Sequence, residues 1–226
     1  MTLFEKQKSV EHLPKLVRLF ALPEVMLLPQ TQLPLNIFEK KFIAMIDNAM
    51  ATDRLIAMIQ PLKETDDSKL HKIGCIGRIT SFQEASKGQY LITLLGLCRF
   101  TLEEEINIDD AQDNEYAFKT ARVNYVDFGD DFTKPSTERQ KLIDRKALIN
   151  SIKNMLVQMD LDIDWNELAD TPNEMLVNAI SMTSPFQIAE KQALLEAPTV
   201  ADRAELLVTL SKMAISDMAQ TFDTIQ

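Results

Sequence analysis

The chain has 226 residues, of which 46% are hydrophobic and 26% are charged, as is usual for a folded globular protein. Its net charge is −10, and residues 1–128 carry −3 from 15 basic and 18 acidic side chains. This balance argues against nucleic acid as a partner, because binding to phosphate needs a basic excess, and against an anionic membrane. There is no apolar run of ~20 residues, and the N-terminal sequence, which lacks a continuous apolar segment, predicts that no secretory signal is present. With only two cysteines, the sequence predicts a cytoplasmic protein without a disulfide scaffold.

The distribution of glycine divides the chain into two regions. All five glycines lie at or before Gly129, and the last 97 residues contain none. Glycine marks turns, bulges and close backbone approach in sheets, so the first region is predicted to be rich in strands and the second to be helical. We therefore expect an N-terminal tail at 1–13, a β-rich module at 14–128 and a helical bundle at 136–226.

Short apolar runs predict the strands of the first region. Outside a central hairpin they lie at 16–20, 24–28, 33–36, 55–59 and 117–125. The third of these runs contains Pro34, which a sheet tolerates at an edge or at the start of a strand.

One helix interrupts these strands after the stretch LPLNIFEKKF, residues 33–42. Apolar residues then recur at helical spacing. Two helix starts are possible. Asn36 and Glu39 can form a capping box that begins the helix at Ile37. Alternatively, Glu39 caps a helix whose first residue is Lys40.

The clearest pair of strands consists of the runs KIGCIGRITSF and YLITLLGLCRFTL. The second run alternates apolar and polar residues with period two, so one side of it is predicted to be buried. The connection SKG fits a short hairpin with Gly88 in a left-handed conformation. Pairing of Ala85 with Gln89 then fixes the register of both strands.

This register also places the two cysteines. It sets Cys98 opposite Ile76 rather than Cys75, so the thiols are predicted to lie on opposite faces without a bond. Two small buried apolar residues are the simplest interpretation.

The second region carries distinct helix-start signals. A long helix is predicted at 138–159, followed by a short one near DWNEL. The remaining caps are predicted at Thr171 before Pro172, Ser184 before Pro185, and Thr199.

No catalytic, cofactor-binding or metal-binding constellation is evident. The sequence lacks both the phosphate-binding G-x-x-x-x-G-K-[ST] loop and the G-x-S-x-G nucleophile elbow. Asp160, Asp162 and Asp164 begin like a calcium loop, but Trp165 stands where such a loop needs glycine. We therefore expect no cofactor, no metal and no enzymatic activity.

The order of segments resembles the Lon protease N-terminal domain family. LPEVMLLPQTQLPLNIFEKKFIAMIDNAM resembles its entry segment, and DRLIAMIQP, IGCIGRITSF and YLITLLGLCRF resemble its next strands. EMLVNAISMTSPFQIAEKQALLEAP is similar to the helical part of small bacterial proteins built from this domain alone. The resemblance spans about residues 14–215. It implies an α+β fold, with a PUA-like β pseudobarrel followed by an α-helical bundle. Relatives often have proline where this chain has Lys40, which favours Glu39 as the helix cap.

In full-length Lon this region helps to recognise substrates. The sequence has no Walker motif and no Ser–Lys catalytic pair, so the resemblance implies a stand-alone form without the ATPase and peptidase domains. Its implied partners are unfolded or partly unfolded protein segments, or a component of regulated proteolysis or quality control. The alternatives are an enzyme with an unrecognised hydrolytic site and an RNA-binding PUA-like protein, which the acidic charge opposes. No feature of the sequence fixes the oligomeric state.

Five residues are candidates for contacting a bound peptide. Ile37, Phe38 and Phe42 form an apolar corner that is either part of a groove or simply core. Arg78 and Arg99 are either polar contacts for a peptide or members of structural salt bridges, for example with Glu39.

Overall fold

The structure is a computed structural model of the whole chain. It describes residues 9–85, 88–106, 118–133, 141–158 and 171–223. The chain divides into two compact units, which are treated separately below. The first is Met1–Thr133 with Phe186–Leu195, and the second is Lys134–Pro185 with Glu196–Gln226. Part of the helical stretch expected at 136–226 is thus counted with the β-rich unit.

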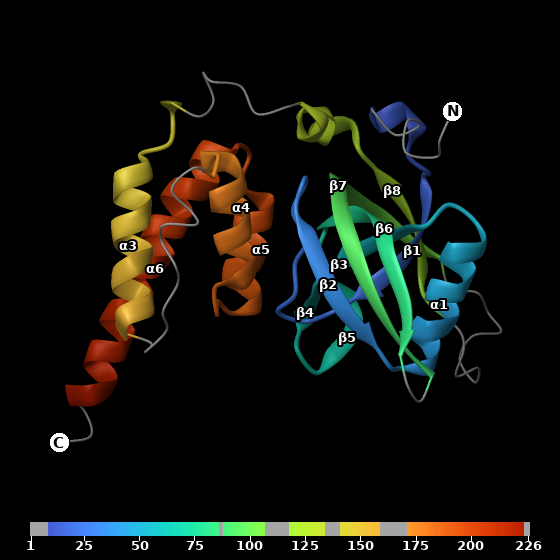
Figure 1. Cartoon of the computed structure of the whole chain (residues 1–226), viewed down its shortest axis with the longest axis horizontal. Coiled ribbons are helices and arrows are strands. Elements are labelled where there is room, and N and C mark those ends of the chain that lie inside the picture. The colour runs from blue at the N-terminus through green and yellow to red at the C-terminus, as the bar shows by residue number, and fades with distance from the viewer. Residues whose placement is uncertain (1–8, 86–87, 107–117, 134–140, 159–170, 224–226) are drawn as a thin grey trace. The chain divides into compact units, whose positions relative to one another are not determined.

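The first unit is built on a ring of strands (Figure 1). Its described strands are β1 (Leu16–Ala21), β2 (Gln32–Ile37), β3 (Leu55–Ile59), β4 (Pro61–Lys63), β5 (Asp66–Leu70), β6 (Ile73–Ala85), β7 (Gln89–Ile106) and β8 (Thr120–Asn124). Six of them form one sheet in the order β2-β7-β6-β3-β1-β8, and an added β7–β8 pairing closes the ring. The predicted α+β fold with a β pseudobarrel is confirmed.

The 18-residue strand β7 makes this closure possible because it pairs with different strands along its length. Residues 90–95 of β7 pair with β2, and residues 101–106 pair with β8. β2 therefore lies at the edge of the sheet, where Pro34 was predicted to be tolerated.

The predicted hairpin register is confirmed. Ala85 lies opposite Gln89 and Cys98 lies opposite Ile76, although two bulges interrupt the ladder between them. Gly88 has a φ of 70°, the left-handed conformation expected at the turn. Both cysteines are buried and free, as predicted.

The strand predicted at 24–28 is wrong, because these residues form a loop, of which residues 26–28 are buried. Leu27 and Leu28 are fully buried over the cross-strand pair Gly77–Gly96. A Cβ at Gly96 would meet the carbonyl oxygen of Leu28, so glycine is needed for this close approach. The Gln30 amide nitrogen donates to the Gly96 carbonyl at 2.9 Å and holds the end of the loop.

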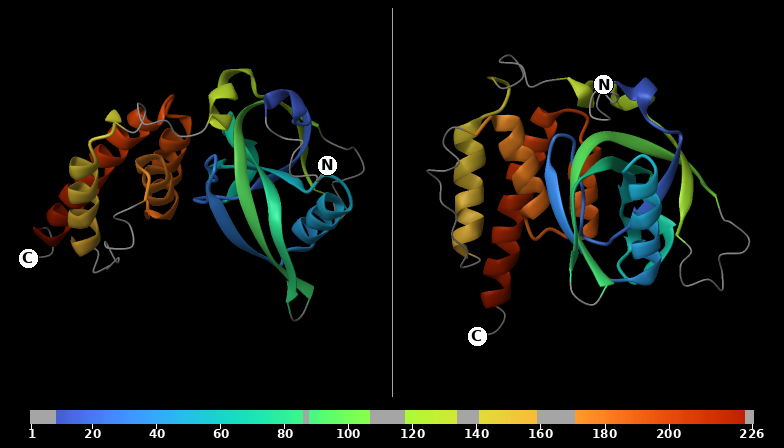
Figure 2. Two further views of the ribbon diagram at one scale, coloured as in Figure 1. Left: turned by 45° about the horizontal axis from the view of Figure 1, so that its top comes forward. Right: turned by 45° about the vertical axis from the view of Figure 1, so that its right-hand side comes forward.

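Helix α1 (Lys40–Ala51) covers one side of the barrel (Figure 2). Glu39 is its N-cap and Lys40 its first residue, which confirms the second of the two predicted starts. Its end is held by Arg18 of β1, which donates to the side chains of Asn48 at 2.6 Å and Asp53 at 2.8 Å. Two short 3₁₀ segments, η2 (Val10–His12) and η5 (Val126–Phe132), also belong to this unit.

Helix α5 (Ile188–Glu196) is attached to the first unit by polar contacts. The ammonium of Lys191 donates to the Glu24 carbonyl at 2.7 Å, and the Gln192 amide donates to the Ile73 carbonyl at 3.0 Å. The cap predicted at Ser184 is wrong. The helix begins at Ile188 instead. The backbone amide nitrogen of Gln187, the residue before it, donates to the Glu190 carboxylate.

The second unit contains helices α3 (Arg145–Gln158), α4 (Asn173–Thr183) and α6 (Val200–Asp223). The Ser151 hydroxyl donates to the Val208 carbonyl at 3.2 Å, which joins α3 to α6. No helix among the described residues is both long and apolar enough to span a membrane.

Helix caps of the second unit follow the predictions in part. At α6, the Thr199 hydroxyl accepts from the Asp202 amide nitrogen at 3.1 Å, and the Asp202 carboxylate accepts from the Thr199 amide nitrogen at 3.0 Å. The predicted capping residue Thr199 is thus confirmed. The cap predicted at Thr171 is wrong by one residue, because Pro172 occupies the N-cap position. The turn near DWNEL and the aspartates at 160–164 lie outside the described residues.

Candidate functional site

The apolar corner predicted from sequence is mostly core. Ile37 is 2% exposed and Phe42 is 8% exposed, and the Phe42 ring packs against Phe20 with centroids 4.4 Å apart. Only Phe38 is accessible, with 64% of its surface exposed. The helical period of α1 turns Phe42 inward, whereas Phe38 lies in the link between strand and helix and has no core position to fill.

The two predicted arginine contacts are also buried. Arg99 forms an ion pair with Asp131 at 2.9 Å, and the side chains are 7% and 8% exposed. Its guanidinium also donates to the Leu195 carbonyl at 3.2 Å and lies over the Phe128 ring. Arg78 is 4% exposed, and burial lowers the pKa of its guanidinium while nearby Asp53 opposes that shift. The structure therefore does not bring the five predicted residues together on one surface.

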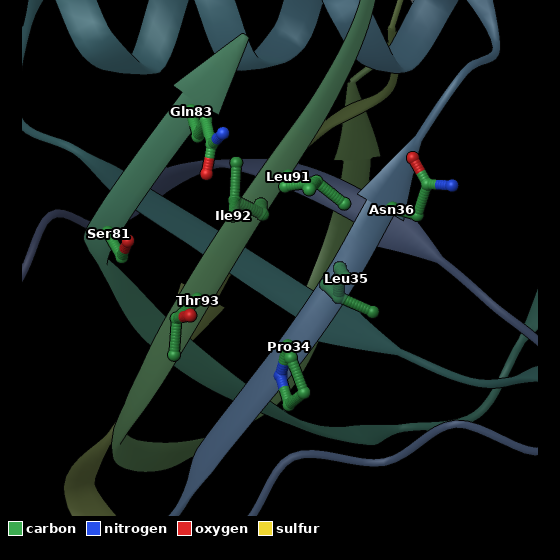
Figure 3. Close-up of a pocket in the computed structure, with 8 residues that line it drawn as sticks. All are labelled: Pro34, Leu35, Asn36, Ser81, Gln83, Leu91, Ile92 and Thr93. Atoms are coloured by element: carbon green, nitrogen blue, oxygen red, sulfur yellow. The ribbon is translucent and has the colours of Figure 1, made fainter. Parts of the chain in front are cut away.

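A different part of the first unit is open. A hollow of about 470 Å³ crosses β2, β7 and β6 near the hairpin (Figure 3). Six of its lining residues share one side of the three strands, and Leu35 and Ile92 complete the lining. We call these six the β2–β7–β6 face: Pro34, Asn36, Ser81, Gln83, Leu91 and Thr93.

Strand pairing builds this face from two cross-strand rows, because directly opposite residues place their side chains on the same side. In the first row, Leu91 stands between Asn36 and Gln83. In the second row, Thr93 stands between Pro34 and Ser81. Figure 3 shows the two rows crossing the strands in parallel.

The opposite side of β7 is buried at this point. Ile92 is 2% exposed and Leu94 is 0% exposed, so they contribute to the core. The alternation of β7 thus gives Leu91 and Ile92, adjacent in sequence, opposite environments. Leu91 remains 44% exposed, an apolar residue on a face that is polar apart from Leu91 and Pro34.

The chemistry of the face is neutral. It presents two carboxamides, two hydroxyls, a leucine and a proline, with no ionisable side chain. Among the residues that the structure describes, the side chains of Asn36 and Gln83 form no hydrogen bond, and both residues are exposed, so their donors and acceptors face solvent. Such a surface can hold apolar groups and hydrogen-bond to peptide groups, and its lining places no general base beside the Ser81 and Thr93 hydroxyls to activate them.

Nothing in the described ranges suggests a metal site, because no group of three or more histidine, cysteine or acidic residues clusters there. The two thiols are equally unsuited to nucleophilic chemistry. Burial raises the pKa of Cys75 and of Cys98, which keeps both in the unreactive thiol form.

Sequence reasoning missed the β2–β7–β6 face, although one signal for it was present. The predicted hairpin register pairs Gln83 with Leu91, so it already places a carboxamide beside this leucine. The partner strand β2, which supplies Asn36 and Pro34, could not be placed, because its pairing with β7 is long-range and joins segments far apart in the chain.

Comparison with known proteins defines the class of this chain. The model of a family described as the ATP-dependent protease La (LON) substrate-binding domain matches residues 17–212. The chain belongs to this family.

The relatives and solved structures agree with this placement. The Lon protease of Flavobacterium johnsoniae is 25% identical over 229 residues, covering 93% of this chain and 25% of the relative. Lon protease 2 of Myxococcus xanthus is 25% identical over 205 residues, covering 88% of this chain and 24% of the relative. The chain therefore spans about a quarter of the length of these curated relatives.

Two solved domain structures share the fold of this chain. The Lon N-terminal domain protein from Xanthomonas campestris has a TM-score of 0.58 at 17% identity, covering 87% of this chain and 98% of that one. The N-terminal domain of the Mycobacterium avium complex Lon protease has a TM-score of 0.60 at 18% identity, covering 88% of this chain and 98% of that one.

Proposed function

We propose that this protein is a non-catalytic binding module for unfolded or partly unfolded protein segments and that it acts in proteolysis or protein quality control. Membership of the substrate-binding domain family supports a role in substrate recognition. We place this activity in the cytoplasm, with a proteolysis component as a further partner. Neither nucleic acid nor a membrane is proposed as a partner, given the net charge of −10.

The observation that supports a site for this function is the accessible apolar surface at the hairpin end of the first unit. Leu91, 44% exposed, stands on the β2–β7–β6 face, and Phe38, 64% exposed, directly follows the end of β2. Apolar side chains that stay exposed beside neutral polar groups are common in peptide-binding surfaces. We propose these two residues as the apolar contacts for a bound segment.

Binding of a permanently unfolded protein tests this proposal. Reduced and alkylated α-lactalbumin is suitable, because it is acidic and is not attracted to an acidic chain by charge. We expect saturable binding by fluorescence anisotropy, and Leu91→Ser or Phe38→Ser to weaken it about fivefold to tenfold, because truncating a contributing interface residue costs more than about 1 kcal/mol.

A matched control is available in the same unit. Val126 on η5 is 80% exposed and lines a separate hollow. Val126→Ser removes the same kind of apolar surface, and we expect it to change the dissociation constant less than about twofold. Absence of saturable binding by the natural chain would count against the function, and an equal loss in Val126→Ser would count against the site.

A further inference from the structure

The hollow on the β2–β7–β6 face lies in an unusually uncharged part of an acidic protein. Charged residues make up 26% of the chain and give it a net charge of −10. Yet β2 contains none, and residues 89–95 of β7 contain none. Glu84, the nearest acidic residue on β6, is paired with Tyr90 and so lies on the opposite side from Gln83 and Leu91. None of the residues that line this hollow carries a charge that could pair with a charged group entering it.

Two carboxamides bracket the apolar centre of this surface. Asn36 and Gln83 stand on either side of Leu91 in one row across the strands. Each carboxamide offers a carbonyl acceptor and an amino donor. They complement a peptide unit, whose N–H can donate to the carbonyl and whose C=O can accept from the amino group. Neighbouring strands are ~4.8 Å apart, so the two carboxamides are based ~10 Å apart, a span of about three residues of extended chain.

From this arrangement we infer that the face binds an extended, uncharged stretch of an unfolded protein. An apolar side chain of that stretch packs on Leu91 and Pro34, and its peptide groups exchange hydrogen bonds with Asn36 and Gln83. Selection is therefore against charge of either sign rather than for a particular sequence, because burying an ionised group here has a desolvation cost without a compensating ion pair. The inference rests on the proposed function and specifies its substrate class.

The face, rather than the free edge of β2, is the binding element in this arrangement. Proline in a sheet is confined to positions where its missing N–H points away from the ladder, so Pro34 leaves the free edge without one donor at its centre. An added strand would have to accept that gap, whereas the side-chain carboxamides of the face remain available to any extended backbone.

The test uses the whole 226-residue chain and three labelled peptides of about twelve residues. The first contains only leucine, valine, serine and asparagine; in the others two serines become aspartate or lysine. We expect both charged peptides to bind about fivefold more weakly than the neutral one. We also expect the neutral peptide's affinity to change less than about twofold between ~50 and ~500 mM NaCl, because no ion pair is involved.

Charge substitutions at Gln83 locate the selectivity. Gln83→Lys is expected to strengthen binding of the aspartate peptide about threefold to tenfold and to weaken binding of the lysine peptide, and Gln83→Glu is expected to reverse that order. Ala51→Lys, at the exposed end of α1 and outside the hollow, adds the same charge and is expected to leave the order of the peptides unchanged. Because Gln83 is exposed, these variants should fold like the natural chain, which their thermal unfolding would verify.

The outcomes separate the two proposals. If the natural chain binds unfolded α-lactalbumin but binds neutral and charged peptides equally, the selectivity is overturned and the function stands. If the lysine peptide binds best and added salt removes the preference, acidic surface elsewhere is responsible and the assigned site is overturned. If neither the unfolded protein nor any peptide binds, both proposals fail.

Discussion

Two stretches of strand β7 show how differently one strand can be used. Near its start, Leu91 and Thr93 stand on an open face flanked by carboxamides and hydroxyls. Further along, Arg99 is enclosed, with η5 supplying Asp131 and the end of α5 supplying the Leu195 carbonyl. The charged residue that looked suited to binding is structural, and the accessible residues are neutral.

The difference arises from what covers each stretch rather than from the strand itself. Both stretches have the alternation of a half-buried strand. The buried charge of Arg99 is paired with the Asp131 carboxylate, which also accepts a hydrogen bond from the Arg99 backbone amide nitrogen at 2.8 Å. Around Leu91 no covering element is needed, because Asn36, Gln83 and the hydroxyls can be satisfied by water. The burial of Arg99 with its partners therefore indicates an architectural role, and the exposure of Leu91 among neutral polar groups that line a hollow makes it a candidate for binding.

The enclosed stretch offers the largest expected effect. Asp131→Ala removes the carboxylate that pairs with the buried Arg99 guanidinium, and removing one partner of a buried ion pair typically costs about 3–5 kcal/mol. We expect the free energy of unfolding, measured by urea denaturation, to fall by that amount. Asp127→Ala, at an exposed position of the same η5 segment, should change it by less than about 0.5 kcal/mol.

A double variant sharpens the same comparison. Arg99→Met combined with Asp131→Ala removes both charges, so it should recover part of the lost stability. If Asp131→Ala alone costs less than about 1 kcal/mol, the ion pair does not anchor η5 and the distinction between the two stretches fails.

Adjacent residues of the open stretch provide the second test. Ile92, 2% exposed, points into the core, and truncation to alanine should cost about 2–4 kcal/mol in the free energy of unfolding. Leu91→Ala removes a side chain of the same size from the open face, where the expected cost is below about 0.5 kcal/mol. Similar losses for both variants would mean that the β2–β7–β6 face is covered in solution.

Much of this architecture could be predicted from local signals. The hairpin register followed from the turn at Gly88 and from alternation, and the start of α1 followed from the family's preference at position 40. The cap at Thr199 was predictable because its partner Asp202 lies only three residues away. These features depend on contacts between residues that are near one another in the chain.

The errors concern long-range packing. Leu27 and Leu28 were expected in a strand because they are apolar, but they are buried by lying over Gly77 and Gly96. Arg99 was a candidate contact because no sequence pattern revealed Asp131 as its partner. For the same reason the open face could not be assembled, since it depends on β2 pairing with β7. A residue's side of a strand can be predicted locally, but what covers that side cannot.

The free edge of β2 gives a test that is read from self-association rather than from stability, and it is the most specific test of the open stretch. Pro34 is exposed and lies in β2, the edge strand of the sheet, opposite Thr93 of β7. Pro34→Thr adds a backbone donor to this edge without altering the core, so we expect the free energy of unfolding to change by less than about 1 kcal/mol. The completed edge should favour strand-to-strand association, because an edge with all its donors is a template for pairing. Sedimentation over a range of concentrations should therefore show more self-association than in the natural chain.

Gln32→Thr changes a side chain on the same side of β2 and leaves the number of edge donors unchanged, so it should behave like the natural chain. If the two variants associate equally, proline does not protect this edge, and edge pairing becomes the better explanation for any peptide binding at the β2–β7–β6 face.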